Sequence, residues 1–255
     1  MRALILILAL SSLAAAPLEF EVASVKPSPE GNGVRGGCHG IDSKYNPDES
    51  GSAPPLGRCV IRDGRLSHLI FIAYRLQFIG MIQGASDWII AGTDRYTIEA
   101  KAEEPAKTTE AQLLEMLQNL LAERFKLKSH WQTAEKPGFR LVVVKNGPKL
   151  KGAASEGVAA SVLGSIKVPP GQPANVTFRK YSMPGLADWL SNPVQAPIVD
   201  RTELTGEYDF KLSWDETNGP ALTTALQQQL GLKLESQKVP MRYFVIESAE
   251  KPSEN

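Results

Sequence analysis

The amino-acid sequence predicts an α+β fold built from two tandem β-α-β-β-α-β-β repeats, in which antiparallel hairpins pack against helices. Short segments of alternating polar and apolar residues, such as residues 96–101, are typical of half-buried strands. Leucines spaced three and four residues apart, as in residues 113–121, are typical of an amphipathic helix. Both kinds of segment follow one another in the same order twice, which favours one duplicated small unit over a single doubly wound sheet.

The first repeat is predicted over residues 59–150, and its clearest element is the helix that follows Thr109. Thr109 and Gln112 form a capping-box pattern at the start of this helix, and the leucines that follow form its buried stripe. A shorter helix is predicted over residues 66–74, where apolar residues recur with helical spacing. The strands of this repeat are predicted at 60–62, 96–101, 125–128 and 139–143, the last two joined as a hairpin through Pro137-Gly138.

The second repeat is predicted over residues 174–255, after a linker at residues 151–173. The linker is rich in Gly, Ala, Ser and Pro and has no sustained period. One helix is predicted with Pro184 in its first turn, and another between Pro220 and Gly231. The strands of this repeat are predicted at 176–179, 208–212, 232–234 and 243–246.

Residues 1–15 are predicted to be a secretory signal peptide, and residues 16–58 an N-terminal strand followed by a Gly/Pro-rich loop. Arg2 provides a positive start, and the apolar run at residues 4–13 is too short to span a membrane. An uncleaved anchor is the alternative. No later segment is long and apolar enough to span, so the mature chain is predicted to be exported to the periplasm, to the cell envelope or to the medium.

The charge balance argues against a nucleic-acid partner. The chain carries 28 Lys and Arg residues against 28 Asp and Glu residues, whereas nucleic-acid binders usually show a basic surplus or stripe. Hydrophobic residues make up 42% and charged residues 22% of the chain, which excludes a disordered protein and predicts a packed core.

The two cysteines, Cys38 and Cys59, are predicted to form one disulfide. An exported chain meets an oxidising compartment, and the bridge would close a segment that has few other constraints. Metal binding together with His39 and His68 is the alternative. It lacks the paired CxxC spacing of a structural zinc site.

No motif in the sequence predicts catalysis, a metal or a cofactor. There is no GxSxG elbow, no SxxK motif and no HExxH helix. Residues 31–36 match GxGxxG, but prolines precede them and no helical pattern follows, so a loop is predicted there.

The densest polar run, residues 200–209, is a possible binding loop. Arg201 could form a bidentate contact with a carboxylate, while Asp200, Tyr208 and Asp209 would line the loop. Trp214, at the end of the following strand, could line a groove. The alternative is a plain turn in which Asp200 and Arg201 pair with each other, and in which Trp214 is a core residue.

Four motifs carry a resemblance to a known family. They are Phe20-Glu21-Val22-Ala23-Ser24-Val25-Lys26-Pro27, Leu117-Gln118-Asn119-Leu120-Leu121-Ala122-Glu123-Arg124-Phe125-Lys126-Leu127, Val199-Asp200-Arg201-Thr202 with Leu204-Thr205-Gly206-Glu207-Tyr208-Asp209-Phe210, and Gln229-Leu230-Gly231-Leu232-Lys233-Leu234-Glu235 with Val245-Ile246 and Glu250-Lys251-Pro252. Over nearly the whole mature chain they resemble the soil-associated exported protein family, whose function is unknown. Members are similar to segments attached to membrane metallopeptidases of the beta-lactam-sensor type, which implies an extracytoplasmic sensing or binding role. The element order is also similar to that of the short N-terminal domains of secretins and TonB-dependent receptors.

The sequence therefore predicts an exported, non-catalytic binding or sensing module of the bacterial envelope, whose partner is an unknown envelope protein or polymer. Strand edges in such units could recruit that partner. An exported hydrolase is one alternative, with a site assembled between the repeats from Asp200, Asp209 or His130. A self-associating structural protein is another.

Overall fold

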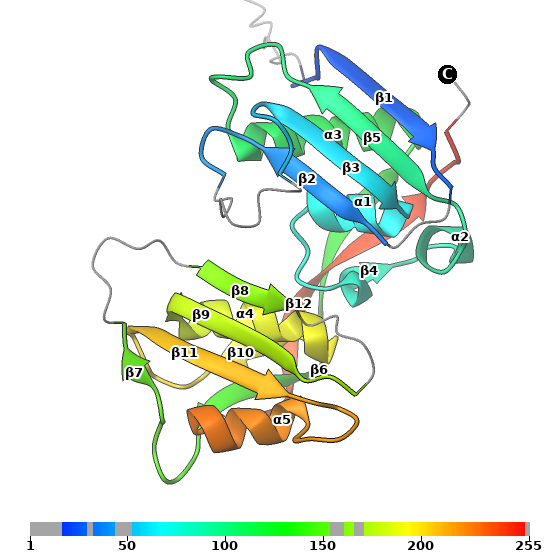
Figure 1. Ribbon diagram of the computed structural model, residues 1–255. Helices are drawn as coiled ribbons and strands as arrows, with labels where there is room; N and C mark the ends of the chain where they lie inside the picture. Colours follow the sequence, from blue (N-terminus) through cyan, green and yellow to red (C-terminus); the bar gives the residue numbers. More distant parts are fainter. Residues whose placement is uncertain (1–16, 30–32, 44–52, 154–160, 166–170, 253–255) are drawn as a thin grey trace, which may run out of the picture. The chain divides into compact units, whose positions relative to one another are not determined.

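The computed structural model confirms an α+β fold with two compact units, each described by itself (Figure 1). The structure describes residues 17–29, 33–43, 53–153, 161–165 and 171–252. Unit 1 consists of residues 1–74, 93–127 and 250–255, and unit 2 of residues 75–92 and 128–249. The predicted signal peptide lies outside the described residues. The predicted first repeat, residues 59–150, contributes to both units, and the duplication itself stays a prediction.

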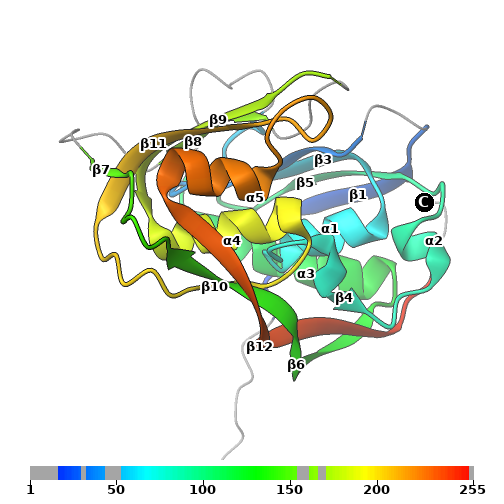
Figure 2. The ribbon, with the colours of Figure 1, turned by 90° about the horizontal axis from the view of Figure 1, so that it is seen from below.

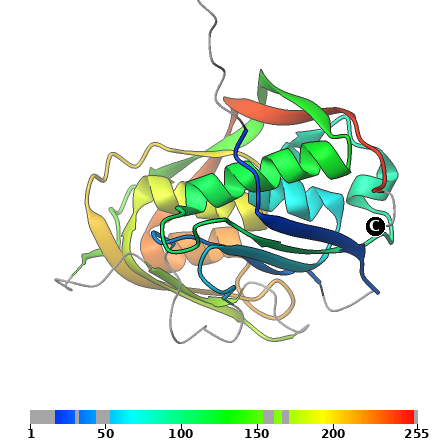
Figure 3. The ribbon, with the colours of Figure 1, turned by 90° about the horizontal axis from the view of Figure 1, so that it is seen from above.

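Unit 1 is an antiparallel sheet with two helices on one face (Figure 3). Its strands, in sheet order, are β1 (Val22–Pro27), β5 (Tyr96–Lys101), β3 (Arg58–Gly64) and β2 (Arg35–His39). The helices are α1 (Leu66–Ala73) and α3 (Glu110–Arg124). Alternation along the strands buries Ile61 and Ile98 on the helix side. On the other face Arg62 and Glu99 form an exposed ion pair at 3.4 Å.

Helix α3 begins where the sequence predicts. The Thr109 hydroxyl accepts a hydrogen bond from the backbone N–H of Gln112, and the Gln112 Oε1 atom accepts one from the backbone N–H of Thr109. This capping box satisfies two of the donors that the first turn of a helix leaves open. The stripe Leu113, Leu117 and Leu121 is fully buried and anchors the helix on the sheet.

The predicted disulfide between Cys38 and Cys59 is present. The two residues stand directly opposite each other on β2 and β3, with their Cα atoms 4.0 Å apart. Both side chains are buried, and the bridge fastens the edge strand β2 to the centre of the sheet. Because both sulfur atoms are in the bridge, the alternative of a metal site that uses these thiols is excluded.

Unit 2 contains a second antiparallel sheet, one face of which packs against α4 and α5 (Figure 2). Its strands, in sheet order, are β7 (Lys151–Gly152), β11 (Glu207–Trp214), β9 (Ala174–Ser182) and β8 (Ser161–Ser165). Helix α4 spans Met183–Val194, and α5 (Leu222–Ala225) continues into the single-turn π-helix η3 (Leu226–Leu230). Phe178 is the centre of the core, with its ring against those of Tyr181, Trp189 and Phe210. The segment predicted as a linker thus contains two short strands, because each completes the hydrogen bonding at an edge of this sheet.

Unit 2 also contains a long two-stranded ladder formed by β6 (Lys128–Val143) and β12 (Leu232–Ser248). Short strands extend it on each side, β10 (Ile198–Asp200) parallel to β6 and β4 (Ile82–Gln83) parallel to β12. The 3₁₀ turn η2 (Ile79–Met81) precedes β4, and the short helix α2 (Asp87–Ile90) follows it.

The predicted hairpin around Pro137-Gly138 is wrong, because β6 runs straight through these residues. Pro137 stands opposite Lys238 and Gly138 opposite Gln237, so the strand pairs with a segment about a hundred residues further along the chain. A Cβ atom on Gly138 would lie 2.5 Å from the Pro197 carbonyl oxygen, so glycine serves close packing here and not a turn. The long ladder pairs more residues than a local hairpin would, and it replaces the hairpins predicted within each repeat.

Candidate functional site

Strand β1 lies at one edge of the sheet in unit 1. It pairs with β5 along one side, and within the described part of the chain no strand pairs with its other side. Val22 on this strand is 61% exposed, more than any other large apolar side chain of the described residues. An open strand edge presents backbone donors and acceptors that can pair with another chain.

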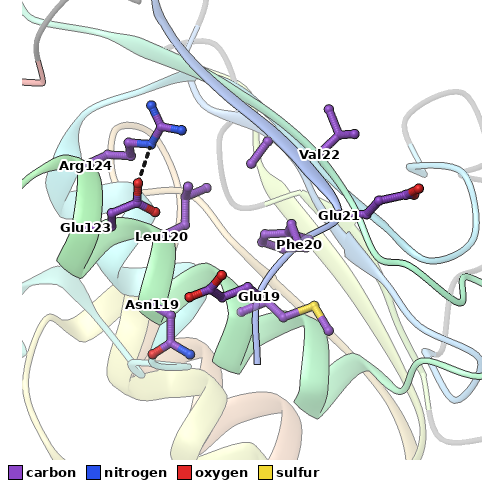
Figure 4. Close-up of a pocket in the computed structure, with 10 residues that line it drawn as sticks. Glu19, Phe20, Glu21, Val22, Asn119, Leu120, Glu123 and Arg124 are labelled. Carbon is purple, nitrogen blue, oxygen red and sulfur yellow. Dashed lines mark ion pairs between the residues drawn. The ribbon is translucent and has the colours of Figure 1, made fainter. Parts of the chain in front are cut away.

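A pocket of about 450 Å³ separates residues 19–23 from α3 (Figure 4). On the helix side the lining residues have the i, i+3, i+4, i+7 spacing of one helical face, and they are Met116, Asn119, Leu120 and Glu123. On the other wall Phe20 projects toward the helix, whereas Glu21 points away from it (Figure 4). The pocket is therefore apolar near Phe20 and Leu120 and carries carboxylates at its rim.

Polar contacts hold the two walls of this pocket in place. The Asn119 side-chain amide donates a hydrogen bond of 2.8 Å to the backbone carbonyl of Leu18. Glu21 forms an ion pair with Lys101 of the neighbouring strand at 2.6 Å. On the helix, the Arg124 Nε and Glu123 Oε1 atoms lie 3.3 Å apart, drawn as the dashed line in Figure 4. The position of the chain before β1 is thus fixed by the helix and by the sheet.

A second, smaller pocket continues the first along β1. It encloses about 280 Å³ and shares Glu123 and Arg124 with the first pocket. Its other lining residues are Val25, Lys126, Glu250, Lys251 and Pro252. The C-terminal segment is held there because the Glu250 N–H donates to the Phe125 carbonyl oxygen at 2.7 Å. The two pockets together form what we call the β1 groove. Glu19 lies at one end and Lys126 at the other.

The predicted binding loop adopts a turn at Asp200 and Arg201. The Asp200 carboxylate accepts hydrogen bonds from the Thr202 N–H at 2.9 Å and from the Thr202 hydroxyl at 2.8 Å. Arg201 donates its backbone N–H to Leu141 and a guanidinium N–H to the carbonyl of Asp200. The local geometry is thus that of the alternative prediction, a plain turn, in which the Arg201 side chain contacts the backbone carbonyl of Asp200 and not its carboxylate. Both residues line a third pocket, in unit 2.

The other predicted loop residues do not line that third pocket. Tyr208 is half-buried against the core of unit 2, and the Asp209 carboxylate accepts a bond from the Lys180 N–H at 2.8 Å. Trp214 is 6% exposed and packs edge-on against Trp189 in the same core. The structure thus brings Asp200 and Arg201 together and leaves the other three apart from them.

The site predicted for the hydrolase alternative is not gathered in one pocket. The pocket that Asp200 lines contains neither Asp209 nor His130. His130 lies on the exposed side of β6, with its Nδ1 atom 2.7 Å from a Glu247 carboxylate oxygen. Over the described ranges, no group of three or more His, Cys, Asp or Glu side chains is placed to hold a metal ion. Nor does any helix in those ranges have the length and apolar character needed to cross a membrane.

Sequence reasoning missed the residues of the β1 groove. The outward face of α3, with Asn119 and Glu123, could have been read from the helical period, and so could the alternation that begins at Glu19. The sequence does not predict that these two stretches form opposite walls of one groove, because that arrangement depends on the order of the strands in the sheet.

Fold and groove together define an α+β protein with an open strand edge beside a helix. Residues 67–249 match the family described as "Protein of unknown function (DUF3738)", and the chain belongs to this family. The matched region includes α3 but begins after β1. No curated protein and no solved structure matches the chain.

Proposed function

We propose that the protein is an exported, non-catalytic binding module of the bacterial envelope that recruits an extended segment of a partner protein along β1. The observation that carries this proposal is the open edge of β1 beside the groove against α3. Export is supported by the disulfide, since such bridges persist in oxidising compartments. The resemblance to soil-associated exported proteins supports the same location.

An added strand would gain main-chain hydrogen bonds from β1, and its alternate side chains would enter the β1 groove. The groove selects those side chains by its chemistry. Phe20 and Leu120 favour an apolar residue at the centre, Glu19 favours a basic residue at one end, and Lys126 favours an acidic residue at the other. The partner is therefore an extended segment with an apolar centre and opposite charges at its two ends.

The test compares two lysine substitutions on unit 1. Val22→Lys places a charge on the open edge, which is how natural edge strands resist pairing. Ile41→Lys is the matched control, because Ile41 is 52% exposed and does not line the groove. Each full-length variant is cross-linked in a periplasmic fraction, and the captured proteins are identified by mass spectrometry.

We expect wild type and Ile41→Lys to capture the same defined protein, and Val22→Lys to lose it. The site of cross-linking should map to residues 19–27 or to the outward face of α3. Equal capture by all three proteins, or capture of no defined protein, would contradict the proposal.

A further inference from the structure

The third pocket lies entirely within unit 2 and encloses about 500 Å³. Five parts of the chain line it, namely residues 75–81, β6, α4, the segment 197–201 that contains β10, and β12. Because β10, β6 and β12 are neighbours in one sheet, its floor is fixed by backbone hydrogen bonds. A pocket built on paired strands keeps its polar groups in fixed positions.

The charged groups of this pocket give it a positive surplus, with Arg75, Arg201 and Arg242 against Asp188 and Asp200. Both carboxylates already accept hydrogen bonds. Asp188 accepts one from the side-chain amide of Gln77 at 2.8 Å, and Asp200 accepts two from a threonine. Within the described residues, the guanidinium of Arg201 donates to the backbone carbonyl of Asp200 and that of Arg242 stacks on Trp131, and neither forms an ion pair. Two guanidinium groups therefore face the pocket with their charge uncompensated by a local carboxylate.

The remaining wall is apolar and aromatic. Met81, Met241 and Ile198 are buried beneath it, and three prolines complete it. Trp131 is 38% exposed, and the guanidinium carbon of Arg242 lies 4.5 Å from the centre of its ring. This stacking holds the Arg242 side chain in one orientation and leaves its N–H edges able to donate.

We propose that this pocket binds a small organic anion, in which a carboxylate or phosphate monoester is carried on an apolar body. Arg201 and Arg242 would hold the oxyanion through charge-assisted hydrogen bonds, which guanidinium groups form bidentately. The apolar body would lie against Trp131 and the methionine side chains. This site is separate from the β1 groove, and either proposal can fail without the other.

The experiment measures binding of four probes to the full chain by isothermal titration calorimetry. Octanoate and octyl phosphate each carry an anionic group on an apolar body. The control 1-octanol lacks the negative charge, and the control acetate lacks the apolar body. We expect one or both of the first two to bind at least tenfold more tightly than 1-octanol and acetate. Tryptophan emission should change on binding, and the change should be lost in Trp131→Phe.

Variants separate the role of charge from damage to the fold. Arg201→Gln and Arg242→Gln should each weaken binding about tenfold or more. Arg179→Gln, an exposed arginine of the same unit outside the pocket, should have no effect. Asp188→Asn keeps an acceptor for Gln77 but removes a negative charge, so it should strengthen binding several-fold. Equal binding of 1-octanol, equal effects of all three arginine variants, weaker binding by Asp188→Asn, or no binding of either anion would overturn the proposal.

Discussion

The disulfide offers the sharpest test of how unit 1 is held together. Removing it with the double substitution Cys38→Ala and Cys59→Ala frees the edge strand β2 from β3. In the folded state β2 keeps its backbone pairing with β3, so the native sheet is expected to form still. The main effect of the substitution falls on the unfolded chain, which is no longer cross-linked.

The size of the effect follows from the loop that the bridge closes. The two cysteines are 21 residues apart in sequence. In the chain-entropy model a loop of that length stabilises the folded state by about 3 kcal/mol, which is more than a hundredfold in the equilibrium between folded and unfolded unit 1. Both side chains are buried, so the small cavities left by the sulfur atoms add to the loss.

Hydrogen exchange measured by mass spectrometry is the suitable assay. All four tryptophans lie in unit 2, so fluorescence does not report on unit 1. Amides of β3, β5 and α3 that exchange only through unfolding of unit 1 should exchange about a hundredfold faster in the double variant. Amides of β9, β11 and α4 in unit 2 serve as the internal control. An acceleration below about tenfold in unit 1 would refute the argument from loop entropy.

Three further predictions concern single residues. Phe178→Ala should lower the free energy of unfolding of unit 2 by about 3–5 kcal/mol, because the side chain is fully buried among three aromatic rings; urea denaturation followed by tryptophan emission measures this. Thr109→Ala should destabilise unit 1 by about 1 kcal/mol, because the N-terminal cap of α3 is lost. Amide hydrogen exchange should become faster in the first turn of α3, whereas the control Thr108→Ala should leave exchange in that turn unchanged. Burial raises the pKa of the Asp188 carboxyl, so carbon NMR should show it titrating above the ordinary range of an aspartate. The raised pKa means that this group favours folding at low pH and that its contribution is lost as the pH rises through the folded-state pKa, a dependence that Asp188→Asn should remove.

Local signals in the sequence were enough for several elements. The capping box at Thr109 and the leucine stripe after it define α3, because both depend on residues within one or two helical turns. The alternation in residues 96–101 defines β5, and the two cysteines in a chain predicted to be exported define the bridge. In α3 and β5 the residues that form the pattern are neighbours along the chain, and the two cysteines are the only two in the sequence.

The pairing of strands was decided only by the tertiary structure. Pro137-Gly138 has the composition of a turn, yet the residues lie inside β6, since a continuous ladder with β12 satisfies more backbone groups than a local hairpin. The composition of the two units follows from the same pairing, because β6 and β12 belong together although predicted in different repeats.

The candidate sites, too, were determined partly by local sequence and partly by the tertiary structure. The sequence by itself singled out Asp200 and Arg201 as part of a possible binding loop, and it determined α3 as one amphipathic helix. Only the fold brought Arg201 and Arg242 into the lining of one pocket, and only the sheet order left β1 open next to α3. Helical period and caps are set by neighbours along the chain, whereas a pocket or a strand edge is set by which distant segments pair, and that choice depends on the free energy of the whole fold.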